Sequence, residues 1–492
     1  MLLEAGRTCW RVDQADRVAL LIDDAAYFAA AKSALQKARS TVHMLNWAFD
    51  PETELLPRRD ENDALEAELG AFLVGLTEAR PELAVRILCW KSAILISATQ
   101  DFFPHRAKRC FKDTAVQFHL DATVPFGGCH HQKVIVIDGQ IAFTGSSDFA
   151  PDRWDTSEHL DTDARRRHSG FGGGFYASRH EVMAVVDGTA AASLEAVFGR
   201  RWQRATGETL ASTKLQDSAA WPDTVAPDFN GVATGLSRTE PAWHDQKAVG
   251  EVEALHLASI AAASRCIYLE NQYLTSPVMG AALAARLREP SGPEVVLVSN
   301  QLSPSWFDQL TMDRRRSAFM SQLRAADHHG RLRAYTPVTA SGAPILVHAK
   351  LAIIDDVFLR VGSANLNNRS GGFDTECDLS FEIDAGDKSG RAAVSHCRNQ
   401  LLACWLACSV GDVVSALDRT DGLGAGIENL RSQGLTRLLP LVSPPLDALG
   451  AKIASWHLGD PLGVDDSWRP WKRPAAVAAK LARASLEIDE RR

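Results

Sequence analysis

The spacing of apolar and polar positions along the chain predicts two series of helices and strands. In the first series, helices are predicted over 25–39 and 64–78, and strands over 41–49, 84–90, 116–120, 133–137 and 141–144. In the second series, helices are predicted over 251–264 and 281–288, and strands over 266–269, 294–298, 331–335 and 351–354. The order of elements is the same in both, so we predict an internal duplication of an α/β unit of roughly 170 residues.

The same short motif accompanies one strand in each series. A histidine and, two positions later, a lysine precede the apolar run, an aspartate follows it, and a Gly-Ser pair begins seven positions after the aspartate. The first copy is His131, Lys133, Asp138 and Gly145-Ser146, and the second copy is His348, Lys350, Asp355 and Gly362-Ser363. Two copies at identical spacing favour a shared chemical role, whereas a single His-Lys pair is more often a hydrogen-bonded core group.

The residue types in the motif suit a phosphate group. Histidine and lysine two positions apart point to the same side of a strand. The lysine cation can hold a phosphate oxygen, and the imidazole can attack phosphorus or transfer a proton. The Gly-Ser turns and Asn365 add hydroxyl, N–H and amide donors. Two copies around one phosphate predict a covalent, two-step phosphodiester reaction, in which one histidine attacks and the other protonates the leaving alcohol.

No metal site and no cofactor are predicted from the sequence. The acidic residues form no evident two-metal cluster, so EDTA should leave the activity unchanged. The nine cysteines form no CxxC pair, which indicates free thiols in a reducing compartment and favours neither a disulfide framework nor a zinc site. Cys404 and Cys408 lie one helical turn apart and are expected in a core helix.

These patterns predict an α/β fold with two pseudo-symmetric halves. Each half is expected to be a mixed β-sheet flanked by helices, and the halves should pack face to face with the active site between them. Residues 1–206 form the predicted N-terminal half, and the polar, turn-rich segment 207–241 forms the connection. Residues 242–410 form the C-terminal half, and residues 411–492 form an extension without a counterpart in the first half.

Each catalytic imidazole is expected to need a carboxylate that fixes its tautomer. Glu181 and Glu376 occupy similar places in the two halves, each at the start of an apolar strand. We predict that they pair with the two histidines, and the sequence leaves open whether this pairing crosses between the halves.

The composition is that of a globular protein, with 46% hydrophobic and 23% charged residues. A net charge of −8 argues against a general nucleic-acid binder, although it permits a local basic pocket for one phosphate group. The N-terminal residues lack the apolar stretch of a signal peptide, and no apolar run reaches about 18 residues. We therefore expect a cytoplasmic protein whose membrane contact, if any, is peripheral.

The paired motifs resemble the phospholipase D superfamily, whose signature is HxKxxxxD followed by GSxN. The resemblance covers about residues 15–410 and is nearest to the branch that hydrolyses phosphatidylcholine. The stretches that support it beyond the motifs are 130–133, 142–143, 153–155, 267–273 and 362–370.

The resemblance implies a role for each motif residue. His131 would be the nucleophile that forms a phosphohistidine, and His348 the acid that protonates the leaving group, although the residues alone leave either order open. Water or a primary alcohol would then release the phosphatidyl group. Asp138 and Asp355 would anchor a loop without touching substrate. The residues that would hold the phosphate are Lys133, Lys350, Ser147 and Asn365.

Two residues depart from the family pattern. Asp148 stands where the motif has Asn, and a carboxylate near a phosphate is unfavourable unless it points away or pairs with a cation. Some members of the lipid-hydrolysing branch resemble this chain there, so we expect the change to be tolerated. Glu181 stands where an Asp is expected, which lengthens the side chain by one methylene.

The function that follows is a phospholipase D that hydrolyses the distal phosphodiester of glycerophospholipids to phosphatidic acid and a head-group alcohol, with transphosphatidylation as a side activity. The alternative is a cardiolipin-synthase-like phosphatidyltransferase, although such enzymes usually bring N-terminal membrane helices. The acidic chain disfavours a nuclease-type phosphodiesterase, and the two intact motifs disfavour a non-catalytic binding protein. The expected partner is phospholipid at a membrane surface, with no nucleic acid and no obligate protein partner, because the two halves supply one complete site in a monomer.

Two further segments are interpreted from composition. The insertion 151–178, which contains three consecutive arginines, is either a solvated flap or a mobile lid over the phosphate site. In the extension, Trp468 and Trp471 are expected to pack onto their own domain rather than dock at a membrane, and a charged helix is predicted over 475–487.

Overall fold

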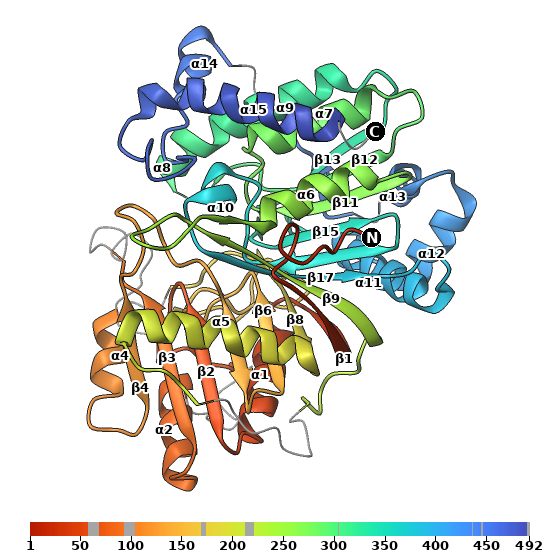
Figure 1. Ribbon diagram of the computed structural model, residues 1–492. Coiled ribbons are helices and arrows are strands. Elements are labelled where there is room, and N and C mark those ends of the chain that lie inside the picture. Colours follow the sequence, from red (N-terminus) through yellow and green to blue (C-terminus); the bar gives the residue numbers. More distant parts are fainter. Residues whose placement is uncertain are drawn as a thin grey trace.

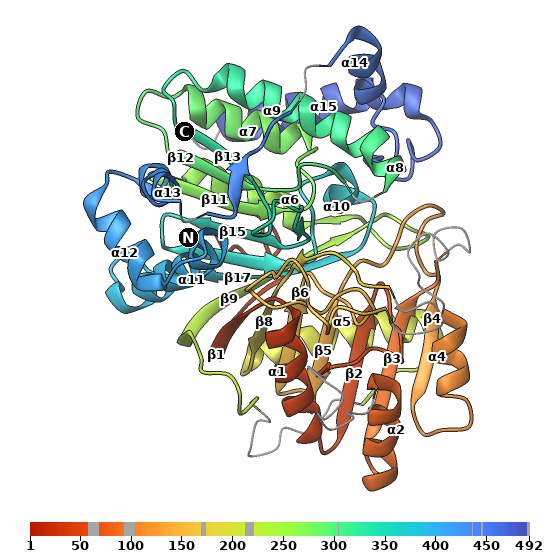
Figure 2. The same cartoon turned by 180° about the vertical axis from the view of Figure 1, so that it is seen from behind.

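The computed structural model describes residues 1–57, 68–92, 104–168, 174–211, 221–303, 305–434, 436–443 and 446–489. Parts of three predicted segments lie outside the described residues: the start of the helix over 64–78, and pieces of the insertion 151–178 and of the connection 207–241. The described strands form one mixed sheet that runs through both halves, with helices on its faces, and one small two-stranded sheet (Figures 1 and 2). The predicted α/β class is confirmed.

The sheet of the first half has a parallel and an antiparallel region. From the outer edge inwards its strands are β4 (Gln117–Asp121), β3 (Ala84–Trp90), β2 (Thr41–Asn46), β5 (Val134–Ile137), β6 (Ile141–Gly145), β8 (Val182–Val186) and β1 (Arg11–Ile22). β4, β3 and β2 are parallel to one another. From β2 through β5, β6 and β8 to β1, every pairing is antiparallel.

The second half repeats this arrangement strand for strand. In the corresponding order its strands are β13 (Leu332–Pro337), β12 (Glu294–Val298), β11 (Cys266–Asn271), β15 (Lys350–Ile354), β16 (Phe358–Gly362), β17 (Glu376–Glu382) and β9 (Phe229–Glu240). The directions of pairing also correspond, parallel from β13 to β11 and antiparallel from there to β9. β18 (Leu438–Pro440) extends the outer edge, and β10 (Val249–Gly250) pairs with β9.

The two halves join through an antiparallel ladder between β1 and β9. The register runs from Arg11 opposite Leu236 to Val18 opposite Phe229. This corrects the interpretation of 207–241 as a polar connection, because its residues Phe229–Glu240 are the first strand of the second half. Glycine, serine and threonine in β9 hide its strand character, yet most of the strand is buried, and Ser237 Oγ donates a hydrogen bond to the Thr8 carbonyl oxygen at 2.7 Å.

The two halves of the sheet also pack against each other, with β6 and β8 of the first half against β16 and β17 of the second. Alternate residues of one strand therefore face different cores. In β5, Val134 and Val136 belong to a central core that both halves share, whereas Ile135 and Ile137 belong to an outer core of the first half. Strands buried on both faces explain why the motif strands are continuously apolar.

The helices cover the sheets on both sides (Figures 1 and 2). In the first half, the outer helices are α1 (Asp24–Gln36), α2 (Leu69–Ala79) and α4 (Pro104–Cys110), and α5 (Thr189–Thr206) packs on the other face. In the second half, the outer helices are α6 (Glu251–Ala262), α7 (Pro277–Arg288) and α9 (Arg314–Ala326). The helices on the central core are α11 (Lys388–Leu406), α12 (Val410–Arg419) and α13 (Leu423–Ser432).

The remaining helices are short or belong to the C-terminal extension. They are α8 (Trp306–Asp308), α10 (Asn368–Gly372), α14 (Ala448–Ser455) and α15 (Arg473–Asp489), which contains the predicted helix over 475–487 and packs on α7. Trp468 and Trp471 are 64% and 67% exposed, so the expectation that they pack onto their own domain is wrong for most of their surface. Cys404 lies in α11, as expected, and Cys408 follows its end.

No single helix among the described residues combines the length and the apolar character needed to cross a membrane. α11 and α12, which meet at an angle of 104°, satisfy both criteria only when they are taken together.

Candidate active site

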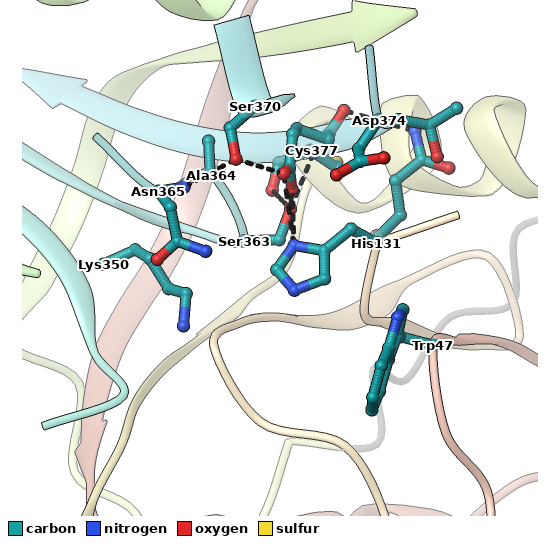
Figure 3. Close-up of polar contacts among 12 residues, drawn as sticks. Trp47, His131, Lys350, Ser363, Ala364, Asn365, Ser370, Asp374 and Cys377 are labelled. Atoms are coloured by element: carbon teal, nitrogen blue, oxygen red, sulfur yellow. Dashed lines mark hydrogen bonds and ion pairs between the residues drawn. The ribbon is translucent and has the colours of Figure 1, made fainter. Parts of the chain in front are cut away.

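The two motif histidines line a single cavity of about 560 Å³, whose walls come from both halves. His131 lies just before β5 and His348 just before β15, so each ring stands at the mouth of an apolar strand. Figure 3 shows the ring of His131 with Trp47 on one side and Asn365 and Lys350 on the other. Among the described lining residues, those that the sequence predicted are His131, Lys133, His348, Asn365 and Glu376.

The carboxylate partners of the two histidines are exchanged between the halves. His131 Nδ1 lies 2.9 Å from Glu376 Oε2, and His348 Nδ1 lies 2.8 Å from Glu181 Oε2. The predicted pairing is present, and each half supplies the carboxylate for the imidazole of the other. Because Nδ1–H donates to the carboxylate, Nε2 is the nitrogen left for chemistry.

Backbone hydrogen bonds hold each histidine to the segment that carries its carboxylate. β7 (Arg179–His180) pairs in parallel with β14 (Leu346–Val347), and the His348 N–H donates to the His180 carbonyl at 2.8 Å. At the equivalent place in the other half, the His131 N–H donates to the Thr375 carbonyl at 3.0 Å. The orientation of each imidazole therefore depends on both halves.

Glu376 is stabilised as an anion by His131 and two hydroxyls. Ser363 Oγ donates to it at 2.5 Å and Ser370 Oγ at 2.6 Å. Burial acts to raise the pKa of Glu376, but the charge of His131 and these hydrogen bonds outweigh it, so its pKa lies below the usual range.

Glu181 divides its charge between His348 and an arginine. Arg179 Nε donates to Glu181 Oε1 at 2.6 Å. Burial acts to raise the pKa of Glu181, yet His348 and Arg179 together hold it well below its usual range. The pKa of His348 is also lowered, chiefly because burial disfavours the charged ring. The charge of Glu181 acts to raise it, and the charges of Lys350 and Arg179 act to lower it.

Lys133 has a carboxylate as its neighbour. Its ammonium nitrogen donates to the His131 carbonyl at 2.8 Å and lies 3.2 Å from Asp148 Oδ2. The other oxygen of Asp148 accepts the backbone N–H of Trp47 at 2.9 Å. The departure from the motif at Asp148 is therefore accommodated by pairing with a cation, one of the two conditions under which it could be tolerated.

Lys350 has neutral partners. It donates to Gln272 Oε1 at 3.0 Å and to the His348 carbonyl at 2.5 Å, and no described carboxylate lies within ion-pair distance of it. Burial lowers the pKa of Lys350 well below its usual range. The Oδ1 atom of Asn365, on the cavity wall, is buried without a hydrogen-bond partner among the described residues. Asn365 Oδ1 therefore needs a hydrogen-bond donor from a ligand. Lys350, which is not among the described residues that line the cavity, keeps one N–H beyond its two hydrogen bonds for an anion.

The assignment of Ser147 as a phosphate ligand is not supported. Ser147 is not among the described residues that line the cavity, and its hydroxyl donates to Asp24 Oδ2 at 2.7 Å. The residue lies one position beyond the serine of the Gly-Ser pair, so its side chain points to the opposite side, toward α1. In the second half the same position is Ala364, which carries no hydroxyl.

Asp138 and Asp355 anchor the chain away from the cavity, in the manner that the resemblance implied. Asp138 accepts the backbone N–H groups of Arg39, Ser40 and Thr41, which lead into β2. Asp355 accepts those of Ser264, Arg265 and Cys266, which lead into β11. Both aspartates have positive φ, 53° and 55°, which non-glycine residues seldom adopt outside tight turns.

Several lining residues were missed by the sequence reasoning. Arg179 precedes the histidine and glutamate of a predicted strand, but nothing in its spacing indicated a cavity. Part of the insertion 151–178 also reaches the site, which fits its expected place near the first motif, whereas its consecutive arginines are not among the described lining residues. The missed residues include Trp47, Asp152, Arg153, His168, Arg179 and Arg369.

Comparison with known proteins places both halves in one family. A family model described as "Phospholipase D" matches residues 34–233, and one described as "Cardiolipin synthase, PLD-like domain" matches residues 257–405. Phospholipase D A of Dictyostelium discoideum is 24% identical over 76% of this chain, and phospholipase D alpha 4 of Arabidopsis thaliana is 23% identical over 70%. The cardiolipin synthase of Halalkalibacterium halodurans is 25% identical over 52%.

The chain spans only 33%, 58% and 42% of the length of these three relatives, in the same order. Among solved structures, the phosphatidylserine synthase of Haemophilus influenzae Rd KW20 superposes with a TM-score of 0.52 over 80% of this chain and 87% of that one, at 12% identity, and shows a similar fold. Both halves match models of this family, repeat one strand order and exchange the partners of their histidines across one cavity. The chain therefore belongs to the phospholipase D superfamily.

Proposed function

We propose that this protein is a phospholipase D, which hydrolyses the distal phosphodiester of glycerophospholipids to phosphatidic acid and a free head-group alcohol. The observation that carries the proposal is the pair of imidazoles on one cavity, each fixed through Nδ1 by a buried glutamate of the other half. This arrangement presents two Nε2 atoms to one ligand, and two-step transfer of a phosphatidyl group requires one nucleophile and one acid.

The reaction follows from the roles of the two rings. His131 Nε2 attacks phosphorus, the P–N bond forms, and the P–O bond to the head group breaks. His348 gives its Nε2 proton to the departing alcohol oxygen. Water then loses a proton to His348 and attacks phosphorus, and the P–N bond breaks to release phosphatidic acid. A primary alcohol in place of water gives transphosphatidylation. The proposed steps use only imidazoles and cations of the chain.

The charges of the site match a phosphodiester. Lys133 is compensated by Asp148, whereas Lys350 keeps one N–H beyond its two hydrogen bonds, which can be donated to a non-bridging oxygen. A bound anion opposes the burial that lowers the pKa of Lys350 and of His348, so substrate itself favours the protonated acid that the first step needs.

Exposed aromatic side chains around the cavity favour a lipid over a nucleic acid. Gly127, which follows Phe126 and faces the ring of Trp468, lines the cavity. Ser305 and Asp308, which flank Trp306 and Phe307, also line it. An exposed aromatic rim suits the interface of a membrane, where these rings are enriched, and the net charge of −8 disfavours a general nucleic-acid binder. The rim consists of Phe126, Trp306, Phe307 and Trp468.

A cardiolipin-synthase-like phosphatidyltransferase is the second candidate. The family model that matches residues 257–405 carries the description of a cardiolipin synthase. Both candidates share the phosphatidyl-histidine step and differ in the acceptor, which is water for a hydrolase and a lipid hydroxyl for a transferase. A nuclease-type phosphodiesterase is the least supported reading.

The test uses mixed substrates and one inactive variant. The protein is incubated with phosphatidylcholine vesicles, with phosphatidylglycerol vesicles and with a single-stranded oligonucleotide, and products are measured by mass spectrometry. We expect phosphatidic acid and choline from the first, and no product with His131→Ala.

The other outcomes are distinct. Cardiolipin and glycerol from phosphatidylglycerol, with little phosphatidic acid, would identify the transferase. Cleavage of the oligonucleotide with the lipids intact would exclude both lipid reactions.

A further inference from the structure

A second cluster of reactive side chains lies behind Glu181. It consists of Asp23, His159, His180 and Cys404, whose oxygen, nitrogen and sulfur atoms all lie within 4.8 Å of one another. Asp23 precedes α1, His159 belongs to the insertion 151–178, His180 ends β7, and Cys404 lies in α11 of the second half. None of the four is among the described residues that line the active-site cavity.

Both imidazoles of the cluster are oriented by a carboxylate on their far side. His159 Nδ1 lies 3.1 Å from Asp155 Oδ2, and His180 Nε2 lies 2.8 Å from Glu270 Oε2. A carboxylate that holds one nitrogen of the ring leaves the other as a lone-pair donor, and this is the usual environment of a metal-binding histidine.

The nitrogens on the near side are buried and unsatisfied. His159 Nε2 and His180 Nδ1 form no hydrogen bond to any described residue, and both rings are essentially buried. They lie 3.6 Å and 2.8 Å from the two oxygens of Asp23, without the geometry of a hydrogen bond. Two buried, unpaired imidazole nitrogens aimed at one carboxylate carry a desolvation cost that a cation between them would remove.

A protonated His180 does not account for the whole cluster. An imidazolium between Asp23 and Glu270 satisfies that ring, but it leaves His159 Nε2 without a partner and gives Cys404 no role beyond a weak contact to the Ser157 carbonyl at 3.3 Å. A tetrahedral zinc ion has bonds of about 2.0–2.3 Å, which places its ligands roughly 3.3–3.8 Å apart. The ligand atoms of the cluster all lie within 4.8 Å of one another, and their Cys-His-His-Asp chemistry suits zinc.

We propose that Asp23, His159, His180 and Cys404 bind a structural Zn²⁺ ion that ties the first half to α11. The four ligands are far apart in the sequence, so no CxxC spacing indicates the site. The ion also fixes Glu181, because the Glu181 N–H donates to Asp23 Oδ1 at 3.2 Å and the Asp23 N–H donates to the Glu181 carbonyl at 2.9 Å. It takes no part in the phosphoryl chemistry, and the proposal is independent of the proposed function.

The test measures metal directly. Full-length protein purified without chelators is analysed by inductively coupled plasma mass spectrometry, alongside Cys404→Ser and the matched control Cys408→Ser. We expect one zinc ion per chain in the unmodified protein and in the control, and a several-fold lower content in Cys404→Ser.

Cobalt replacement keeps the test decisive even if Cys404→Ser folds poorly. Zinc is removed from the unmodified protein with dipicolinate and Co²⁺ is added. We expect the thiolate-to-cobalt charge-transfer band and the strong visible bands of a tetrahedral site, and we expect them in Cys408→Ser as well. Absence of these bands in the folded, unmodified protein would overturn the proposal. Equal zinc content in Cys404→Ser and the unmodified protein would also overturn it, because the metal would then bind elsewhere.

Discussion

The two half-sites share one motif and one strand order, yet their charges are arranged differently. In the half-site of His131, the glutamate partner is supported by neutral hydroxyls and the lysine is compensated by Asp148. In the half-site of His348, the glutamate partner also serves Arg179, and the lysine faces the neutral Gln272. The backbone repeats the geometry, whereas the neighbours of each motif decide what its histidine and lysine can do.

This difference supports a division of labour. We propose that the second half-site, which offers an amide and a lysine without a described carboxylate at ion-pair distance, binds the anionic phosphate and holds the acid. The first half-site, whose lysine is paired with Asp148, then presents His131 to phosphorus. Four predictions test this contrast, beginning with the largest expected effect.

Removal of either histidine should abolish turnover, with a loss of at least about 10³-fold in kcat. The two variants should differ with a phosphatidyl ester of an acidic phenol, whose leaving group needs no proton. His348→Ala should still form the covalent phosphatidyl-histidine, because the nucleophile is intact, and His131→Ala should not. Intact-protein and peptide mass spectrometry locate the adduct.

His131→Ala protein that carries the adduct at His348 would reverse the assignment. A double variant without either histidine is the control for non-specific labelling.

Removal of either glutamate charge should cost activity by roughly 10²–10⁴-fold, because the imidazole loses the group that sets its tautomer. Glu181→Gln should in addition lower stability more than Glu376→Gln, by up to about 3 kcal/mol, since among the described residues it leaves the buried Arg179 with the more distant Asp152 as its ion-pair partner. Steady-state kinetics and urea unfolding measure the two effects. Equal stability of the two variants would contradict the inferred sharing of Glu181.

The pH dependence should report the lowered pKa of His348. In the free enzyme the ring is protonated only below its pKa, which lies well below the usual range of histidine, so kcat/KM should fall about tenfold per pH unit above that lowered pKa and level off below it. Bound substrate raises this pKa, so kcat should persist to higher pH. A profile of kcat/KM that stays level from acidic to neutral pH would instead assign the neutral nucleophile to His348.

The smallest effect is expected from exchanging Asp148 and Asn365, which lie two positions after the serine of each Gly-Ser pair. Asp148→Asn removes the counter-ion of Lys133 while keeping an oxygen for the Trp47 N–H, so KM should fall by about threefold to tenfold. The reciprocal change Asn365→Asp should raise KM by a similar or larger factor. Inhibition by inorganic phosphate gives an independent measure of the same binding. An unchanged KM in both variants would mean that the charge contrast does not affect substrate.

Much of the fold followed from local pattern, because the motif strands are buried on both faces and read as continuous apolar runs. β9 did not, since its polar residues are buried by pairing with β1 and β17, and such pairing partners lie far away in sequence. The histidines and their glutamates could be predicted from spacing and chemical need. Arg179, the orientation of Ser147 and the metal-ligand cluster could not, because each depends on contacts between segments that only the folded chain brings together.

The ladder between β1 and β9 has a practical use. A chain cut between α5 and β9 would give two fragments, each with a histidine but without the carboxylate that orients it. Either fragment alone should therefore be inactive. Pairing of the two edge strands should restore the orientation of both imidazoles at once. Such a pair would make a split-enzyme reporter with very low background, in which the signal measures how often two fused proteins meet.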